Sequence, residues 1–315
     1  MNLSPQGVYT LVDLRAWQQT VASLPPAHVP RFAVIGDPVA QSLSPVMHDA
    51  ALAACGFSGR YTRLHIRAGE LAETLSLLPG CGFLGCNLTI PHKSAALALV
   101  EEVDADARRL GAINTVRIEG EGQHPRRLGF NTDGPGLLLA LRDALGFDTL
   151  RGKSVLLLGA GGAGRALAIQ CALAGCARLL LANRTLEKAE TLVREFSTAN
   201  AELAVSALAL PDAAWTDAPL DGIDLVLNCT SLGLRDTDRS PLPAELLRQF
   251  PALAIYDSVY RRDGQLTPLV AAAQAAGLRA ADGRAMLLWQ GALAFEIWFN
   301  QPAPIAPMRA ALGLC

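Results

Sequence analysis

A glycine-rich turn between an apolar run and a helix-compatible segment constrains the fold of this chain most strongly. The turn is Gly159-Ala160-Gly161-Gly162-Ala163-Gly164, and it directly follows the apolar run at 155–158. In a strand–turn–helix unit, the first glycine permits the tight turn, the second lets the backbone approach a pyrophosphate, and the third allows close helix–strand packing. The helix N-terminus then offers free N–H groups and a positive dipole end. The sequence therefore predicts a Rossmann-like dinucleotide site.

The end of the next predicted strand indicates which dinucleotide binds. Residues 178–182 form that strand, and Asn183-Arg184-Thr185 follows it. An NAD site usually carries an acidic residue here for the ribose 2′-hydroxyl, whereas a nearby arginine accommodates a 2′-phosphate. No acid stands at this position, and Arg184 with Lys188 supplies positive charge. We therefore predict NADP as the cofactor; the alternative is a basic strand end that is merely solvated.

Composition limits the remaining function classes. The chain has 315 residues, 51% hydrophobic and 18% charged, which is enough to build the cores of two domains. Its formal net charge is -2 without a basic block, which argues against nucleic acid and membrane surfaces as partners. The seven cysteines lack C-x-x-C spacing, so neither a disulfide framework nor a metal site is expected. Without a recognisable secretory segment or a long apolar run, we expect a cytoplasmic protein.

Strand and helix patterns alternate along the chain and predict an α/β fold with two domains. We expect residues 1–30 to form an N-terminal extension, in which Thr10 caps a short helix over 11–21. The first α/β domain is expected over 31–131 and the Rossmann-like domain over 132–283. The segment 286–299 is apolar on most helical faces, so residues 284–315 are expected to return to the first domain.

Within these domains the pattern predicts individual elements. In the first domain, strands are expected at 32–35, 60–65, 83–88, 112–118 and 128–130, the last two paired around a polar turn at 120–125. Helices are expected at 45–55, 71–78 and 93–100, and a linking helix at 137–145 follows a break at Asp133-Gly134-Pro135-Gly136. The second domain is expected to have strands near 155, 179, 203, 225 and 254.

A pair of hydroxyls lies in the loop after the first strand of the first domain. Ser44-Pro45 is suited to the N-cap and first position of the following helix. That structural role leaves Ser42 unexplained, although its hydroxyl can turn the same way as that of Ser44 in an extended dipeptide. Two such donors beside a helix start can bind a carboxylate without an arginine. The loop is therefore a candidate anion site.

Other polar residues follow later strands of the first domain. Asn87 and Thr89 alternate onto one side of an extended segment, and Lys93 comes shortly after them. A lysine of this kind is either a solvated charge or, when partly desolvated near a ligand, a proton donor or acceptor. Asn114 and Asp133 add an amide and a carboxylate at further strand ends. From the residues alone, Asp133 is equally well explained as a turn residue.

Taken together, these segments resemble the shikimate dehydrogenase family in order and spacing, from about Phe32 to the C-terminus. The matching motifs are Ser42-Leu43-Ser44-Pro45, Asn87-Leu88-Thr89-Ile90-Pro91-His92-Lys93, Gly111-Ala112-Ile113-Asn114-Thr115, Asn131-Thr132-Asp133-Gly134, the glycine turn, Asn183-Arg184-Thr185, Asn228-Cys229-Thr230-Ser231 with Gly233, 257–260 with Thr267-Pro268, Gly283, Met286-Leu287, Gln290-Gly291-Ala292 and 294–298.

The resemblance implies an NADP-dependent oxidoreductase that reversibly reduces 3-dehydroshikimate to shikimate in chorismate and aromatic amino acid biosynthesis. It implies a substrate-binding catalytic domain over 31–131 with 284–315 and an NADP domain over 132–283. In the substrate site, it assigns proton transfer to Lys93 with Asp133 as its partner, the carboxylate to Ser42, Ser44, Thr89 and Tyr260, and the ring hydroxyls to Asn114, Asp133 and Gln290.

The same resemblance assigns the cofactor residues. Gly159, Ala160, Gly161, Gly162 and Ala163 would hold the pyrophosphate, while Asn183, Arg184, Thr185 and Lys188 would surround the adenosine 2′-phosphate. Ser258 and Gly283 would lie near the nicotinamide, and Ser258 stands where the family often has an apolar residue.

Two alternatives remain open from the sequence. A quinate/shikimate or aminoshikimate dehydrogenase is the nearer one, and Arg184, Thr185 and Lys188 weigh against an NAD-dependent form of it. A non-catalytic ligand-sensing homologue is the distant one; Lys93 and Asp133 are both present, and the first 30 residues are too short for an effector domain. In either case the expected partner is a small-molecule substrate, and the protein is expected to be a monomer or a homodimer.

Overall fold

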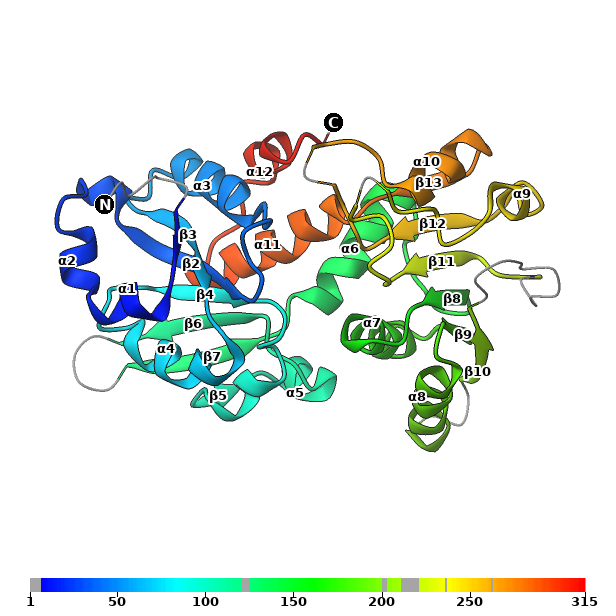
Figure 1. Ribbon diagram of the computed structural model, residues 1–315, viewed down its shortest axis with the longest axis horizontal. Coiled ribbons are helices and arrows are strands. Elements are labelled where there is room, and N and C mark those ends of the chain that lie inside the picture. The colour runs from blue at the N-terminus through cyan, green and yellow to red at the C-terminus, as the bar shows by residue number, and fades with distance from the viewer. Residues whose placement is uncertain are drawn as a thin grey trace. The chain divides into compact units, whose positions relative to one another are not determined.

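The computed structural model describes residues 7–120, 125–199, 203–210, 221–235, 237–261 and 263–314. They fall into two compact units (Figure 1). Unit 1 comprises the chain up to Gly136 together with Leu287 onward, and unit 2 comprises Leu137–Met286. The α/β fold is as predicted, and each unit has its own sheet.

Unit 1 is built on a seven-stranded mixed sheet with the order β1-β3-β2-β4-β6-β7-β5. Strands β4, β6 and β7 pair antiparallel in succession, and the other pairs are parallel. The carboxyl ends of β2, β4 and β7 and the amino end of β6 therefore lie along one edge of the sheet. The strands are β1 Val8–Tyr9, β2 Pro30–Gly36, β3 Arg60–His65, β4 Gly85–Leu88, β5 Glu102–Val103, β6 Thr115–Glu119 and β7 Arg126–Phe130.

Helices cover both faces of this sheet, and each face has its own apolar core. One core joins β2 and β3 to α3, α11 and α12, with Met47, Phe295 and Met308 fully buried. The other core lies under α1, α4 and α5 and includes Leu14, Leu75 and Ala107. The helices of unit 1 are α1 Leu11–Arg15, α2 Trp17–Val21, α3 Ser44–Ala54, α4 Leu71–Leu77, α5 Ala105–Leu110 and α12 Ile305–Ala311, with 3₁₀ turns at Pro26–His28, Ala68–Glu70 and Ala95–Ala98. Two helices belong to both units: α6 Asp133–Leu145 is part of unit 2 from Leu137 on, and α11 Arg284–Phe299 is part of unit 1 from Leu287 on.

The N-terminal segment, whose role the sequence left open, packs into unit 1. Val8 and Tyr9 pair with Arg63 and Leu64 as an edge strand, and a capping box between Thr10 and Asp13 starts α1. Trp17 is only 3% exposed and contacts the ring of Tyr9 edge-on and that of Phe83 in a tilted arrangement, at centroid distances of 5.3 and 5.2 Å. The segment thus completes one edge of the sheet and part of its core.

Unit 2 has a six-stranded parallel sheet with the order β10-β9-β8-β11-β12-β13, which can be followed across this unit in Figure 1. Numbered within the unit this order is 3-2-1-4-5-6, the arrangement of dinucleotide-binding sheets. Its strands are apolar because both faces of a parallel sheet are covered. The elements are β8 Ser154–Leu158, α7 Gly162–Leu173, β9 Arg178–Asn183, α8 Leu186–Ala199, β10 Ala204–Ala209, β11 Leu225–Asn228, α9 Ala244–Leu247, β12 Ala254–Asp257, α10 Pro268–Ala275 and β13 Arg279–Ala281.

Two local predictions were wrong. The expected helix over 93–100 is a turn followed by the 3₁₀ helix Ala95–Ala98, because the Lys93 carbonyl accepts the N–H of Ile113 at 2.8 Å and is withdrawn from helical bonding. The expected break at Asp133–Gly136 is instead the first turn of α6, where Asn131 Oδ1 accepts the N–H groups of Asp133 and Gly134. A proline is compatible with a first helical turn because no intrahelical N–H bond is required there.

Part of the predicted polar turn at 120–125, residues 121–124, lies outside the described residues. Among the described helices, none is both long and apolar enough to cross a membrane.

Candidate active site

The two serines of the β2–α3 loop present their hydroxyls to each other. Ser42 Oγ lies 3.1 Å from Ser44 Oγ and accepts the backbone N–H of Ser44 at 3.2 Å. Ser44 is the first residue of α3 rather than its N-cap, which is Leu43 and makes no side-chain capping bond. The structural explanation for Ser44 as an N-cap is therefore wrong, and the paired hydroxyls are left available at a helix N-terminus.

A buried network connects this loop to the ends of β4 and β6. Tyr61 on β3 donates its hydroxyl to Asn87 Oδ1 at 2.8 Å, and Asn87 Nδ2 donates to Thr115 Oγ1 at 3.0 Å. Burial raises the pKa of the Tyr61 phenol well above 10, and the neighbouring Ser44 side chain acts in the opposite direction. Tyr61 therefore stays a neutral donor, adjacent to both Ser44 and Asn87.

Asn114 is the next member of the network, at the amino end of β6. Its Oδ1 accepts the N–H of Thr132 at 2.7 Å, and its Nδ2 donates to Thr132 Oγ1 at 2.9 Å. The same amide group lies 3.5 Å from Oε1 of Gln290 on α11, and Gln290 itself donates to the Leu287 carbonyl. Asn114 is 2% exposed, so these bonds fix its orientation. Two predicted site residues, 176 positions apart, are thereby brought together.

Lys93 and Asp133 form an ion pair of 2.7 Å between Nζ and Oδ2. Their side chains are 32% and 18% exposed, so the pair is accessible yet partly shielded from solvent. Asp133 is held at the start of α6 by Asn131, and it directly follows the Thr132 bound to Asn114. A cationic donor next to a carboxylate, at strand ends that also carry hydroxyls and amides, is suited to proton transfer.

Thr89 is the remaining residue of unit 1 that the sequence predicted for the site. It follows β4, is half-buried, and its backbone N–H donates to the Ile35 carbonyl at 2.9 Å. Tyr61, Thr115 and Thr132 were not identified as site residues from the sequence. Thr115 and Thr132 stand in two of the matching motifs, but those motifs gave them no role, and Tyr61 stands in none.

In unit 2, the glycine turn has the geometry that the sequence predicted. Gly159 adopts φ +101, a region that favours glycine, and a Cβ on Gly164 would lie 1.9 Å from the Gly159 carbonyl oxygen. By contrast, a Cβ on Gly161 or Gly162 would meet no atom of the described residues within 4 Å. The turn therefore packs tightly against its own helix on one side, while its backbone at the N-terminus of α7 remains open on the other.

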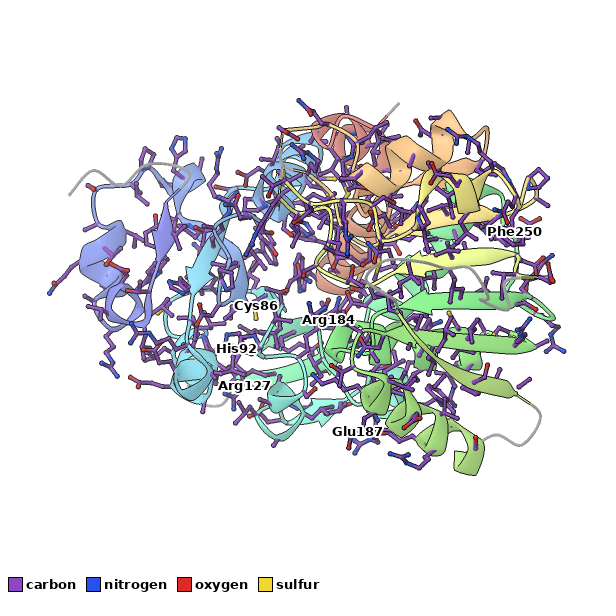
Figure 2. The ribbon with its side chains drawn as sticks, turned by 45° about the vertical axis from the view of Figure 1, so that its right-hand side comes forward. Cys86, His92, Arg127, Arg184, Glu187 and Phe250 are labelled. Carbon is purple, nitrogen blue, oxygen red and sulfur yellow. The ribbon has the colours of Figure 1, made fainter. Side chains whose placement is uncertain are left out.

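The end of β9 flanks this turn. Asn183 Oδ1 accepts the N–H of Ala160 at 2.9 Å, so its side chain braces the glycine turn. Arg184, Thr185 and Lys188 are exposed beyond it, and Figure 2 labels Arg184 with its neighbour Glu187. A glycine turn that is open to phosphates, beside an exposed cationic strand end, fits a dinucleotide with a 2′-phosphate.

The ends of β11 and β12 follow this turn along the same edge of the sheet, because β11 pairs with β8 and with β12. A Cβ on Gly159 would lie 3.1 Å from the backbone of Cys229. Asp257 is fully buried and accepts hydrogen bonds from Thr267 Oγ1 at 2.6 Å, Asn228 Nδ2 at 2.8 Å and Val259 N at 3.1 Å. Burial raises its pKa to about 6 despite these bonds. Ser258 and Tyr260 follow it, and a Cβ on Gly283 would lie 2.3 Å from the Ser258 carbonyl oxygen. Close approach of two backbones thus requires glycine at 283.

Comparison with known proteins decides the family. Residues 34–116 match the shikimate dehydrogenase substrate binding domain, 143–231 the shikimate / quinate 5-dehydrogenase model, and 283–312 the shikimate 5'-dehydrogenase C-terminal domain. A shikimate dehydrogenase (NADP(+)) of Moorella thermoacetica is 42% identical over 286 residues, covering 89% of this chain and 93% of the relative. The chain belongs to the shikimate dehydrogenase family. The predicted resemblance is therefore confirmed.

Solved structures of this family share the fold. Shikimate 5-dehydrogenase from Thermus thermophilus, solved in complex with NADP(H) and shikimate, has a TM-score of 0.74 and 41% identity, covering 90% of this chain and 99% of that one. Quinate dehydrogenase from Corynebacterium glutamicum, solved with NAD, has a TM-score of 0.76 but 28% identity, with coverage of 90% and 98%. The fold is thus common to enzymes with different substrates, and the sequence is more similar to the former.

Proposed function

We propose that this protein catalyses the reversible, NADPH-dependent reduction of 3-dehydroshikimate to shikimate, a step of chorismate and aromatic amino acid biosynthesis. The observation that carries the proposal is the Lys93–Asp133 ion pair of 2.7 Å at the sheet edge that also holds Asn114 and the serine pair. One edge thereby combines a proton donor with groups for hydroxyls and for a carboxylate. Family membership supports the same reaction.

Unit 1 is the substrate-binding unit in this proposal. The hydroxyls of Ser42 and Ser44 bind the substrate carboxylate, together with Thr89; the family resemblance assigns Tyr260 to the same carboxylate. Asn114, Asp133 and Gln290 bind the ring hydroxyls, which both donate and accept, as amides and carboxylates require. The bonds from Asn114 to Thr132 and Gln290 set the amide's orientation before substrate arrives. This preorganisation favours one pose of the ring.

Lys93 is the proton-transfer residue. When bound, NADPH supplies a hydride to the ring carbonyl carbon. The carbonyl oxygen then gains negative charge, and the Lys93 ammonium donates a proton to it, leaving a hydroxyl and a neutral amine that recovers its proton from solvent. Asp133 holds the ammonium in place and accepts a hydrogen bond from the neighbouring substrate hydroxyl. In the oxidation direction the same groups work in reverse, with Lys93 accepting the hydroxyl proton.

Unit 2 is the NADP-binding unit. Gly159, Ala160, Gly161, Gly162 and Ala163 receive the pyrophosphate on open backbone at the α7 N-terminus. At the end of β9, Arg184, Thr185 and Lys188 bind the 2′-phosphate, and Asn183 braces the turn between the two phosphate sites. Ser258 and Gly283 lie on the nicotinamide side.

The proposal is tested by oxidation of shikimate, followed at the absorbance of the reduced cofactor. NADP and NAD are compared in parallel, with quinate as the second substrate. The proposal predicts turnover of shikimate with NADP and little turnover with quinate or NAD. Comparable rates with quinate, or a preference for NAD, would instead assign the chain to the broader quinate/shikimate enzymes.

A further inference from the structure

Strand β3 places two polar side chains beneath the β2–α3 loop. Tyr61 packs in the core shared with α3, and Arg63, two residues further along the strand, lies on the same face of the sheet. Both residues are buried, with 2% and 6% of their surface exposed. A guanidinium at this depth is costly unless it is hydrogen-bonded and partnered by charge, so its contacts identify what it serves.

The Arg63 guanidinium is directed at the backbone of Ser42. Its Nη2 donates to the Ser42 carbonyl at 2.6 Å and its Nε donates to the same oxygen at 3.2 Å. The nearby carboxylate is Asp49 on α3, which forms its ion pair with Arg60 at 3.1 Å. Burial raises the pKa of Asp49, while the Tyr61 N–H, Arg60 and Arg63 lower it. Arg63 therefore connects strand β3 to one specific peptide of the loop.

Through this contact, the Ser42 carbonyl joins the other polar groups of the residue in having a hydrogen-bond partner. The Ser42 N–H donates to the Val39 carbonyl at 3.1 Å, and its hydroxyl oxygen accepts from Ser44 N. With the carbonyl held by Arg63, every polar group of Ser42 has a defined partner. The direction of both serine hydroxyls follows from that one peptide, because Ser44 Oγ in turn pairs with Ser42 Oγ.

We propose that Arg63 is a positioning residue for recognition of the substrate carboxylate. By binding the Ser42 carbonyl, it fixes the orientation of the Ser42 and Ser44 hydroxyls and places a buried positive charge at the backbone of Ser42. The inference rests on the proposed function, since it assigns the carboxylate to the serines. Hydrogen bonds to charged groups are among the strongest in proteins, and a cation near a site of low dielectric favours an anion over its neutral analogue. Arg63 thus contributes to selectivity for an acid without touching it.

The test compares Arg63→Met and Arg63→Lys with Arg60→Met as the matched control. Arg60 lies on the same strand and pairs with Asp49 at 3.1 Å. For Arg63→Met we expect the KM for shikimate to rise about tenfold, with kcat and the KM for NADP changed less than about twofold, which corresponds to about 1.4 kcal/mol of binding. Arg63→Lys keeps the positive charge but loses the paired N–H donors of the guanidinium. Its KM for shikimate is therefore expected to lie between those of wild type and Arg63→Met.

A second readout separates positioning from general loosening of the structure. The methyl ester of shikimate lacks the negative charge, so its inhibition constant against shikimate oxidation is expected to rise by a smaller factor in Arg63→Met than the KM for shikimate. Arg60→Met is expected to leave both constants unchanged. If Arg63→Met does not fold, a raised KM in Arg63→Lys supports the inference, and an unchanged KM there overturns it.

Two failures are distinguishable in this design. Wild-type protein without shikimate turnover overturns the proposed function and the inference together. Active wild type with an unchanged shikimate KM in the Arg63 variants, or an equal loss of affinity for acid and ester, overturns only the role of Arg63.

Discussion

A buried histidine predicts how the stability of unit 1 depends on pH. His48 on α3 is 1% exposed, and its ring stacks on Tyr61 at a centroid distance of 4.4 Å. Within the described part of the chain, its Nε2 has no hydrogen-bond partner. Desolvation by burial lowers the pKa of this imidazole from 6.5 to about 3. The folded protein therefore holds His48 neutral over a range in which the unfolded chain binds a proton.

The sign and size follow from this difference. Below pH 6.5, His48 binds a proton in the unfolded state but stays neutral in the folded state. The free energy of unfolding therefore decreases as pH falls from 6.5 toward 3. From the two pKa values of His48, the linkage relation predicts that the free energy of unfolding is about 2 kcal/mol lower at pH 5 than at pH 7. His48→Met replaces the ring with an apolar, adaptable side chain of similar size, which cannot titrate.

Urea unfolding at pH 7 and pH 5 measures the effect. Three of the four tryptophans, Trp17, Trp289 and Trp298, belong to unit 1, so their fluorescence follows its unfolding. Between pH 7 and pH 5, the free energy of unfolding of the wild type is expected to decrease by about 2 kcal/mol more than that of His48→Met, whatever the variant's stability at pH 7. His28→Met, at an exposed position, serves as the control. An equal loss in wild type and His48→Met would refute the reasoning.

Three further predictions concern the cofactor, the ion pair and unit 2. Arg184→Asp is expected to shift the NADP:NAD ratio of kcat/KM toward NAD by at least about tenfold, since it replaces a phosphate-binding cation with an acid suited to the ribose hydroxyl; a preserved ratio would exclude Arg184 from the 2′-phosphate site. Asp133→Asn is expected to lower kcat for shikimate by at least about tenfold through loss of the partner that orients Lys93, and unchanged kinetics would leave Asp133 as a turn residue. Asp257 has its pKa raised from 3.8 to about 6, so wild type loses stability as pH rises through this interval; Asp257→Asn is expected to gain about 2 kcal/mol relative to wild type between pH 4 and pH 7, and parallel profiles in thermal or urea unfolding would contradict this.

The sequence predicted those parts of the fold that are encoded locally. The strand–glycine–helix unit at 155–173 follows from a short apolar run and three spaced glycines, and the structure confirms both the positive φ of Gly159 and the tight contact of Gly164. Two strands of six residues were also predicted: β9, which is marked by the apolar run at 179–182, and β3, at 60–65. The NADP preference was predicted from charge at one strand end and agrees with the family.

Other features depend on contacts that no local pattern encodes. Strand β1 has two residues and β13 has three, and each exists because a neighbouring strand completes its hydrogen bonds. The helix expected at Lys93 is replaced by a turn because Ile113, far along the chain, takes the Lys93 carbonyl.

The same limit applies to the site. Lys93 and Asp133 are 40 residues apart, and their pairing was expected only from the family resemblance. Arg63 gave no signal, since a buried arginine that serves a backbone carbonyl 21 residues away looks like any charged residue on a strand.

The central claim is that Lys93 transfers the proton, and one comparison tests it most directly. Steady-state shikimate oxidation with NADP and calorimetric titration of shikimate are carried out on wild type, Lys93→Met and Lys153→Met; Lys153 forms an exposed ion pair with Asp224 at 3.1 Å in unit 2 and is the matched control. We expect the kcat of Lys93→Met to be about 10²–10⁴-fold lower than that of the wild type, while its Kd for shikimate stays within about threefold of the wild-type value. Lys153→Met should behave as wild type. Near-normal turnover by Lys93→Met would contradict the account.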